Sequence, residues 1–442
     1  MSPPTPWSDR VDALIERAYA SFADQPLPAL PLSGPDFLQD AGPFEALSLL
    51  ATHLQKLPQP DAHTRSAARQ LDDAERRLVF RRLTEARRTP AESATISRAT
   101  QQLGPIDDWL RAFERSGSMR LARAVLIVTW QCELRCSYCW IPKQDGRVMT
   151  PETVTGAVEL LMSSDNAHVN LQFFGGEALL EFATVQHAIV TAQQLAAECG
   201  KTVDFVVSTN GWSLTPDRLE WLAQHPVKLE LSLDGDPATQ ATWRKSNIEG
   251  EDSYTRSIAT HAEAIVATGL KHDVIMVVQP RTASRLSDGF FHIADLGFSR
   301  IQINFALGVR WSRPYMEAFA EQLRAIAAGI AERRTAGREI TLVNAEDAPM
   351  PIRLNGEIHV DWDGTVYGSN GFLNETERKA EFVVGHLDDL ACFDRYWMDA
   401  PTNDFLLERT YTPEITDNNL AMGRVMASFV RWYRRDVLGI SA

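Results

Sequence analysis

The chain has 442 residues, which at roughly 150 residues per domain suggests about three structural units. Its 44 Lys and Arg against 58 Asp and Glu give a net charge of −14, which disfavours a nucleic-acid-binding protein, because phosphates attract a basic surface. No apolar run approaches the roughly 20 residues of a membrane helix, and the first residues lack the basic start and apolar stretch of a secretory signal. We therefore expect neither nucleic acid nor a membrane as a partner.

The first part of the chain, residues 1–118, is predicted to be a helical domain. Thr89 and Glu92 match the capping-box pattern, and Pro90 suits the first helical position, so a helix is expected to begin there. The expected helices are Asp9–Phe22, Pro43–Leu57, Ala62–Arg88 and Pro90–Phe113. The Arg-rich run Arg76–Arg88 is either an anion-binding patch or a solvated helix face.

From Leu121 onward, short apolar strand patterns alternate with helical patterns. The expected strands are Ala122–Trp130, His168–Phe174, Thr202–Ser208, Val227–Leu233, Asp273–Gln279 and Arg300–Phe305. The expected helices are Pro151–Met162, Glu181–Glu198, Pro216–Gln224, Tyr254–Thr268, Ser284–Leu296 and Pro314–Arg334. Such alternation predicts an α/β fold with parallel strands, here a partial (β/α)6 TIM-like barrel over residues 119–336, with its chemistry at the carboxyl ends of the strands.

The pattern changes again after Gly337. Alternating residues around Asp363-Gly364 predict a hairpin, and helical and irregular sequence follows. Residues 337–442 are therefore predicted to form a small C-terminal α/β appendage.

Five cysteines in 442 residues are too few for a disulfide scaffold, yet Cys132, Cys136 and Cys139 fall within eight residues. Clustered thiolates select soft metals such as zinc or iron–sulfur centres. Zinc sites usually need four ligands, whereas three thiolates can hold three irons of a [4Fe–4S] cluster and leave the fourth open. The spacing favours the cluster; zinc or a coincidental grouping is the alternative.

This spacing, with Tyr138 before the last cysteine, resembles the signature loop of the radical S-adenosylmethionine (SAM) superfamily. The resemblance continues with Gly175-Gly176-Glu177, Ser208-Thr209-Asn210-Gly211 and Ser232-Leu233-Asp234-Gly235 at successive strand ends, and with Arg244 beyond them. The last pattern is similar to the sulfatase-maturase and peptide-modifying (SPASM) branch. The resemblance spans Leu121–Phe305.

The resemblance implies one [4Fe–4S] cluster on the three cysteines, with SAM on its open iron. Gly175 and Gly176 would let the backbone approach the methionine part, and Glu177 would accept hydrogen bonds from its ammonium group. Tyr138 would lie near the adenine, or would pack in the core.

Other polar residues of the motifs would complete the SAM site. Ser208 and Asn210 would bind the ribose hydroxyls, although Asn before Gly is also common in turns. Ser232 would add a polar contact, and Arg244 would pair with the methionine carboxylate or form a surface ion pair. Asp234 would contribute to the site or shape its turn.

The chemistry implied by the resemblance is reductive cleavage of SAM to methionine and a 5′-deoxyadenosyl radical, which takes hydrogen from an unactivated carbon. Gln279, Gln302 and Asn304 on the last two strands would position the substrate, or would satisfy backbone groups.

The C-terminal region departs from the branch, because Gly368, Ser369 and Asn370 stand where the family places a cysteine. We interpret residues 337–442 as a degenerate SPASM-like domain without auxiliary-cluster cysteines. Cys392 is then either a hydrogen-atom donor to a substrate radical or a buried helix cysteine, and Cys199 is expected to be structural.

Three functions are consistent with these features. The first is modification of a ribosomally made peptide or a protein side chain, with the N-terminal helical domain holding the substrate. The second is radical chemistry on a small metabolite, a sugar or an amino acid. The third is a non-catalytic scaffold. The expected partners are a peptide or protein substrate and a reductant such as flavodoxin or ferredoxin, and the expected compartment is the cytoplasm.

Overall fold

The computed structural model describes residues 121–143, 146–164, 166–256, 261–347, 357–374, 379–389 and 410–440. Six parallel strands form its centre, in the order β1, β3, β4, β5, β7, β8. Their bounds are β1 Arg123–Thr129, β3 His168–Gly175, β4 Thr202–Thr209, β5 Val227–Ser232, β7 Lys271–Val278 and β8 Arg300–Phe305. All six predicted strands are confirmed within about two residues, and each pairs in parallel with the next.

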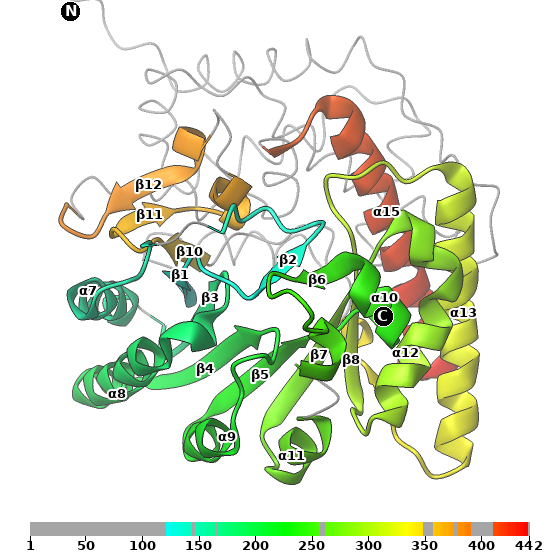
Figure 1. Cartoon of the computed structure of the whole chain (residues 1–442), viewed down its shortest axis with the longest axis horizontal. Coiled ribbons are helices and arrows are strands. Elements are labelled where there is room, and N and C mark those ends of the chain that lie inside the picture. The colour runs from blue at the N-terminus through cyan, green and yellow to red at the C-terminus, as the bar shows by residue number, and fades with distance from the viewer. Residues whose placement is uncertain are drawn as a thin grey trace, which may run out of the picture.

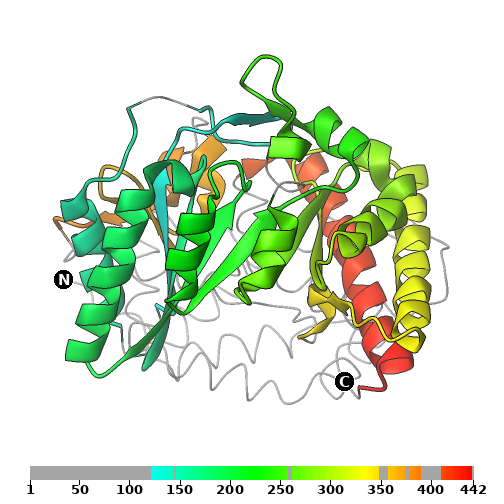
Figure 2. The ribbon, with the colours of Figure 1, turned by 60° about the horizontal axis from the view of Figure 1, so that its bottom comes forward.

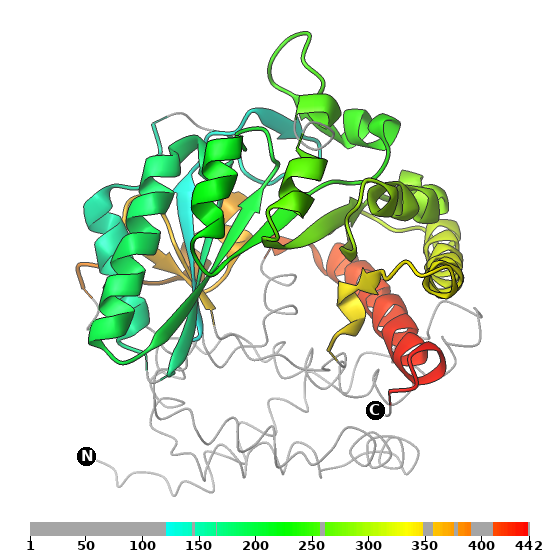
Figure 3. The same ribbon diagram turned by 90° about the horizontal axis from the view of Figure 1, so that it is seen from below.

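Helices cover the outer side of this curved sheet, which gives the partial α/β barrel that the sequence predicts (Figures 1 and 3). They are α7 Pro151–Met162, α8 Phe182–Glu198, α9 Pro216–Ala223, α11 Ala262–Ala267, α12 Leu286–Asp295 and α13 Arg313–Thr335; α10 (Pro237–Trp243) instead contacts β6 (Arg244–Ser246) of a second, smaller sheet. N-capping side chains mark the first turns of α7 and α9: the Thr150 hydroxyl accepts from Thr153 N, and the Thr215 hydroxyl accepts from Arg218 N. Buried strand residues such as Phe173 and Phe205, whose rings stack, form the core between the two layers.

Two predicted helices have additional turns in the structure. Within the predicted helix 254–268, Tyr254 is α-helical, Thr255 and Arg256 are π-helical, and α11 covers Ala262–Ala267, while residues 257–260 lie outside the described residues. The helix predicted over Glu181–Glu198 is confirmed as α8, which a 3-10 turn, η3 (Ala178–Glu181), precedes. The helical domain predicted for residues 1–118, including Arg76–Arg88, lies outside the described residues.

The C-terminal region continues the barrel sheet. Strand β10 (Glu357–Val360) pairs in parallel with β1, and β11 (Thr365–Tyr367) and β12 (Val383–His386) follow in antiparallel order. The predicted hairpin around Asp363-Gly364 is therefore confirmed as β10–β11. On the other edge, β9 (Thr341–Leu342) pairs with β8, and α15 (Pro413–Trp432) packs beside α13.

A second sheet of two short strands lies over the barrel opening (Figure 2). Strand β2 (Leu134–Cys136) runs antiparallel to β6 (Arg244–Ser246), with Cys136 opposite Arg244. This pairing joins the cysteine loop to the segment that carries Arg244. No described helix is both long and apolar enough to cross a membrane.

Candidate active site at the carboxyl ends of the strands

The cysteine loop follows β1, at the carboxyl edge of the sheet where the loops after β3, β4 and β5 also lie (Figure 2). Cys139 N donates to Cys136 O (3.1 Å) in a tight turn. Lys143 Nζ lies 2.9 Å from Cys139 Sγ, and its ammonium also interacts with the thiols of Cys132 and Cys136. Lys143 therefore contacts one of the three thiols and acts electrostatically on the other two.

These thiols are not arranged for a single ion. Within the part of the chain that the structure describes, no three His, Cys, Asp or Glu side chains converge on one metal position. Burial raises the pKa of Cys132 to about 12 and also raises the pKa of Cys136. Both thiols are thus protonated in the metal-free protein, and binding of iron to their sulfur atoms must release the protons.

Two glycines bring the end of β3 against the end of β1. A Cβ on Gly175 would lie 2.4 Å from Thr129 O, and one on Gly176 would lie 2.0 Å from Gln131 O. Gly176 N also donates to Thr129 O (2.8 Å). Any side chain here would collide with backbone, so the cradle beside the cysteine loop depends on glycine.

Glu177 is buried directly behind these glycines. Its Oε1 accepts from Thr209 Oγ1 (2.8 Å) and Leu179 N (3.1 Å), and its Oε2 accepts from Asn210 N (2.7 Å). Burial, reinforced by the nearby carboxylate of Glu133, raises the pKa of Glu177 to about 7. Because a carboxylate offers about four acceptor positions, Oε2 keeps one for a further donor.

Asn210 lies between this carboxylate and the cysteine loop. Its Oδ1 accepts from Trp212 N (2.7 Å), so the side chain shapes a turn, as one of the two interpretations of the Asn-Gly pair requires. Its Nδ2 lies 3.4 Å from Glu133 Oε2 and 3.6 Å from Cys132 Sγ. Glu133 also accepts from Ser213 Oγ (2.6 Å). Sequence reasoning missed Glu133, although its place after Cys132 was a signal.

Asp234 organises the opposite side of the site. Its Oδ1 accepts from Arg244 (3.0 Å) and from Val277 N (3.0 Å), and its Oδ2 accepts from the Tyr138 hydroxyl (2.5 Å). Arg244 forms an ion pair with Asp234, as one of the two alternatives predicts, but the pair is buried and does not lie at the surface. Its Nε has no hydrogen-bond partner among the described residues, and its guanidinium lies 5.4 Å from the Tyr138 ring centre.

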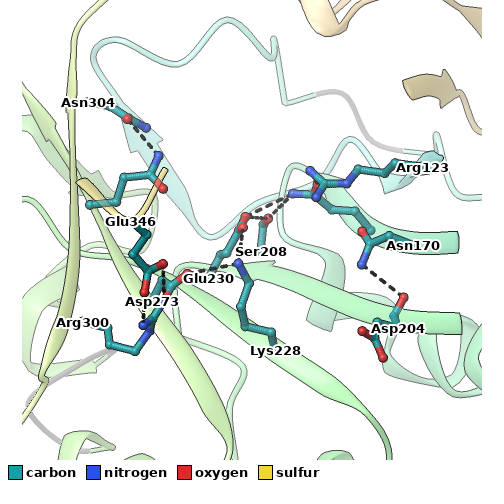
Figure 4. Close-up of polar contacts among 12 residues, drawn as sticks. Arg123, Asn170, Asp204, Ser208, Lys228, Glu230, Asp273, Arg300, Asn304 and Glu346 are labelled. Atoms are coloured by element: carbon teal, nitrogen blue, oxygen red, sulfur yellow. Dashed lines mark hydrogen bonds and ion pairs between the residues drawn. The ribbon is translucent and has the colours of Figure 1, made fainter. Parts of the chain in front are cut away.

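Ser208 lies on the inner face of the barrel in a hydrogen-bonded group with two neighbouring strands (Figure 4). Its Oγ donates to Glu230 Oε2 (3.0 Å) and accepts from Gln172 Nε2 (2.9 Å). Gln172 also donates to Glu230 Oε2 (3.1 Å) and accepts from Arg123 (3.3 Å). Glu230 lies two residues before Ser232, the last residue of β5.

A row of charges continues this group across the inner face (Figure 4). Lys228 Nζ lies 3.3 Å from Glu230 and 3.0 Å from Asp273, Arg300 Nε donates to Asp273 (2.7 Å), and Arg300 binds both oxygens of Glu346 (2.5 and 2.8 Å). Alternating charges hold the strands together and keep the inner face polar.

The remaining predicted residues are placed as follows. Gln279 is buried at the end of β7, with its Nε2 lacking a hydrogen-bond partner among the described residues. Gln302 donates to Asn304 Oδ1 (3.0 Å) on β8, so these two bind each other. Cys199 caps α8 and is exposed, and Cys392 lies outside the described residues.

The donor set fits an iron–sulfur cluster with SAM. Three soft thiols lie within eight residues of one loop, and each would bind a separate iron of a cluster, so they need not converge on one ion. The glycine cradle and Glu177, with its spare acceptor position, suit an amino-acid group beside them. The unpartnered Arg244 Nε adds a buried donor on the opposite side.

Comparisons with known proteins agree with this geometry. Residues 126–286 match the model of the radical SAM superfamily. The chain contains a radical SAM domain. The predicted resemblance is confirmed, and this domain's cofactors are a [4Fe–4S] cluster and SAM, as expected.

Two curated relatives are similar over shorter stretches. An uncharacterized protein of Methanothermobacter thermautotrophicus is 32% identical over 114 residues, 25% of this chain and 42% of that one. The radical SAM cyclopropyl synthase TigE of Paramaledivibacter caminithermalis is 27% identical over 150 residues, 30% of each. The chain thus spans less than half the length of these curated relatives.

The fold is shared with solved structures of anSMEcpe. The form with bound AdoMet has a TM-score of 0.60 at 15% identity, covering 73% of this chain and 98% of that one. A further anSMEcpe structure, described as holding AdoMet and the Cp18Cys peptide, has a TM-score of 0.59 at 15% identity and covers 72% and 98%. At this identity the likeness concerns the fold.

Proposed function

We propose that this protein is a radical SAM enzyme that uses a single [4Fe–4S] cluster to modify a ribosomally made peptide or a protein side chain. The observation that carries the proposal is the position of the Cys132, Cys136 and Cys139 loop at the carboxyl edge of the sheet, next to the glycine cradle and the buried Glu177. When bound, the cluster and SAM supply the 5′-deoxyadenosyl radical that takes hydrogen from the substrate.

Each residue of the site then has a role set by its contacts. Glu177 accepts from the methionine ammonium through the free position on Oε2, and Arg244 Nε donates to the carboxylate. Ser208 already donates its proton to Glu230, so a ribose hydroxyl would have to donate to Ser208 Oγ. Asp234 holds Tyr138 and Arg244 in place, and burial raises the pKa of Tyr138 well above its usual range, which keeps its hydroxyl a donor.

The polar inner face supports a substrate with hydrogen-bonding groups. Gln279, with its unpartnered amide, is the stronger of the predicted substrate-positioning residues, because Gln302 and Asn304 bind each other. Two similarities suggest a peptide substrate. The chain shares its fold with anSMEcpe, one structure of which holds the Cp18Cys peptide, and part of its sequence is similar to the cyclopropyl synthase TigE.

The deciding experiment is anaerobic reconstitution with iron and sulfide, followed by SAM and dithionite. Wild type should release 5′-deoxyadenosine, whereas Cys136→Ala should release none. Cys199→Ala is the matched control, since Cys199 is exposed at the end of α8. A wild-type protein that binds the cluster but yields no 5′-deoxyadenosine would favour a scaffold. Increased 5′-deoxyadenosine release with a sugar or amino acid, and not with a peptide, would favour a small metabolite.

The single cluster is proposed from the cysteine count. Beyond the signature loop only Cys199 and Cys392 remain, too few for a second cluster of the usual kind. At the hairpin, Gly368 and Ser369 follow β11 beside Tyr367, whose ring stacks on Phe372 at 3.8 Å. About four irons per chain are expected, and about eight would contradict the proposal.

A flavodoxin or ferredoxin as reductant and a cytoplasmic location belong to the same proposal, because such a cluster needs reducing conditions.

A further inference from the structure

None of the roles proposed above for the site residues includes Lys143, although it lies beside the cysteine loop. It follows the cysteine loop, its side chain is half-buried, and its Nζ lies 2.9 Å from Cys139 Sγ. The same ammonium interacts electrostatically with the thiols of Cys132 and Cys136. A single cation therefore contacts one proposed cluster ligand and acts electrostatically on the other two.

The backbone at Lys143 is unusual as well. Its φ is +58°, and across the described ranges it is the only residue other than glycine with a positive φ. A side chain in this left-handed conformation is disfavoured, and such strain is found mainly where a function needs it. Here the conformation accompanies a lysine directed at the thiols instead of at solvent.

We propose that Lys143 is a positioning residue that raises the reduction potential of the cluster by holding a positive charge beside the Cys139 thiolate. This rests on the proposed function, because it requires the cluster. Reduction adds one electron and hence one negative charge, with no bond made or broken. A nearby ammonium stabilises that charge, and hydrogen bonds to cluster sulfurs and local charge are known to set iron–sulfur potentials.

Lys245 provides a matched control. It lies on β6, opposite Arg135 of β2, so it belongs to the same two-stranded sheet over the site. Its side chain is exposed, and the described contacts of the three thiols do not include it. Water screens the charge of the exposed Lys245 more strongly than that of the half-buried Lys143.

The experiment is an EPR-monitored redox titration of the reconstituted full chain without SAM, with iron content measured in parallel. Lys143→Gln should leave about four irons bound. At a fixed potential it should lower the ratio of reduced to oxidised cluster about tenfold, which corresponds to a shift of about −59 mV in the midpoint potential for one electron. Lys143→Arg should remain near wild type, and so should Lys245→Gln.

Three results would overturn the inference. The first is a K143Q potential no further from wild type than that of K245Q. The second is loss of iron from K143Q, which would make Lys143 an assembly residue. The third is an unchanged potential with weaker binding of S-adenosylhomocysteine, which would assign Lys143 to the cofactor carboxylate. Failure of the proposed function is distinguishable, since wild type itself would then bind no cluster or release no 5′-deoxyadenosine.

Discussion

At the scale of single residues, the site is built from groups that are costly to bury. Glu177 is enclosed with Glu133 nearby, and only three neutral donors compensate its carboxylate. A ligand ammonium would relieve that cost, so the ligand-free protein pays in stability for a site prepared for a cation.

Glu177→Gln should change how stability depends on pH. The ordinary pKa of 4.5 is raised to about 7 in the folded protein. Below about pH 4.5 the group is protonated in both states; as the pH rises towards 7, it ionises first in the unfolded chain. The metal-free wild type should therefore lose roughly 3 kcal/mol relative to E177Q between pH 4.5 and 7 and nothing more above 7. Urea unfolding at several pH values measures this, and parallel curves would refute it.

Gly176→Ala should destabilise the protein by a steric clash of the added methyl group. The new Cβ would fall 2.0 Å from Gln131 O, and the backbone must move to avoid it. We expect a loss of about 1–3 kcal/mol in the free energy of unfolding, together with weaker S-adenosylhomocysteine binding. Gly423→Ala on α15 is the control, because nothing lies within 4 Å there, and it should gain up to about 1 kcal/mol. Equal effects of the two would argue against the cradle.

At the scale of elements, the small β2–β6 sheet fastens the cysteine loop over the barrel. Cys136 pairs with Arg244, and Arg244 in turn binds Asp234 at the end of β5. The position of a proposed iron ligand thus depends on a buried ion pair of another loop.

Asp234→Asn should be strongly destabilising, because Arg244 would remain as a buried charge without its counterion. We expect a loss of about 3–5 kcal/mol in thermal or urea unfolding of the metal-free protein. The exposed i,i+4 pair Arg313–Glu317 is the comparison, and Glu317→Gln should cost at most about 0.5 kcal/mol. A similar small loss at Asp234 would show that the pair is not organising the site.

Local signals explain which elements could be predicted. Thr150-Pro151 and Thr215-Pro216 mark two helix starts within the chain itself, and the structure begins α7 and α9 there. The β2–β6 pairing and the joining of β10 to β1 depend on contacts between distant segments, which no local pattern records. For the same reason the cysteines and Glu177 could be found from motif order, whereas Glu230 and Lys143 are evident only once the chain is folded.

At the scale of the whole molecule, the barrel and the C-terminal hairpin form one sheet. Trp130 Nε1 donates to the buried Asp361 Oδ1 (2.8 Å), and Lys379 lies 5.2 Å from the Trp130 ring centre. The hairpin therefore covers the open edge of β1 with backbone pairing and a side-chain hydrogen bond, and the segment that follows the hairpin adds a cation–π contact.

Truncation after Asp347 should therefore destabilise the barrel itself. It would remove β10–β12 and α15, expose the edge of β1 and leave Trp130 Nε1 without its acceptor. We expect loss of soluble protein or a clear fall in the melting temperature relative to the full chain. Trp130→Phe is the milder variant, expected to cost about 1–3 kcal/mol because the Asp361 carboxylate loses its buried donor. A truncated chain that melts like the full chain would contradict the continuity of the sheet.

The β2–β6 pairing also bears on the order in which folding and iron binding occur. Its two strands are separated by about a hundred residues, so closing that loop costs chain entropy that only a largely assembled barrel can offset. The cysteine loop should be among the last segments to become ordered during folding. Iron loading would then follow folding, and an intermediate lacking β5 would expose three thiols without capturing the metal.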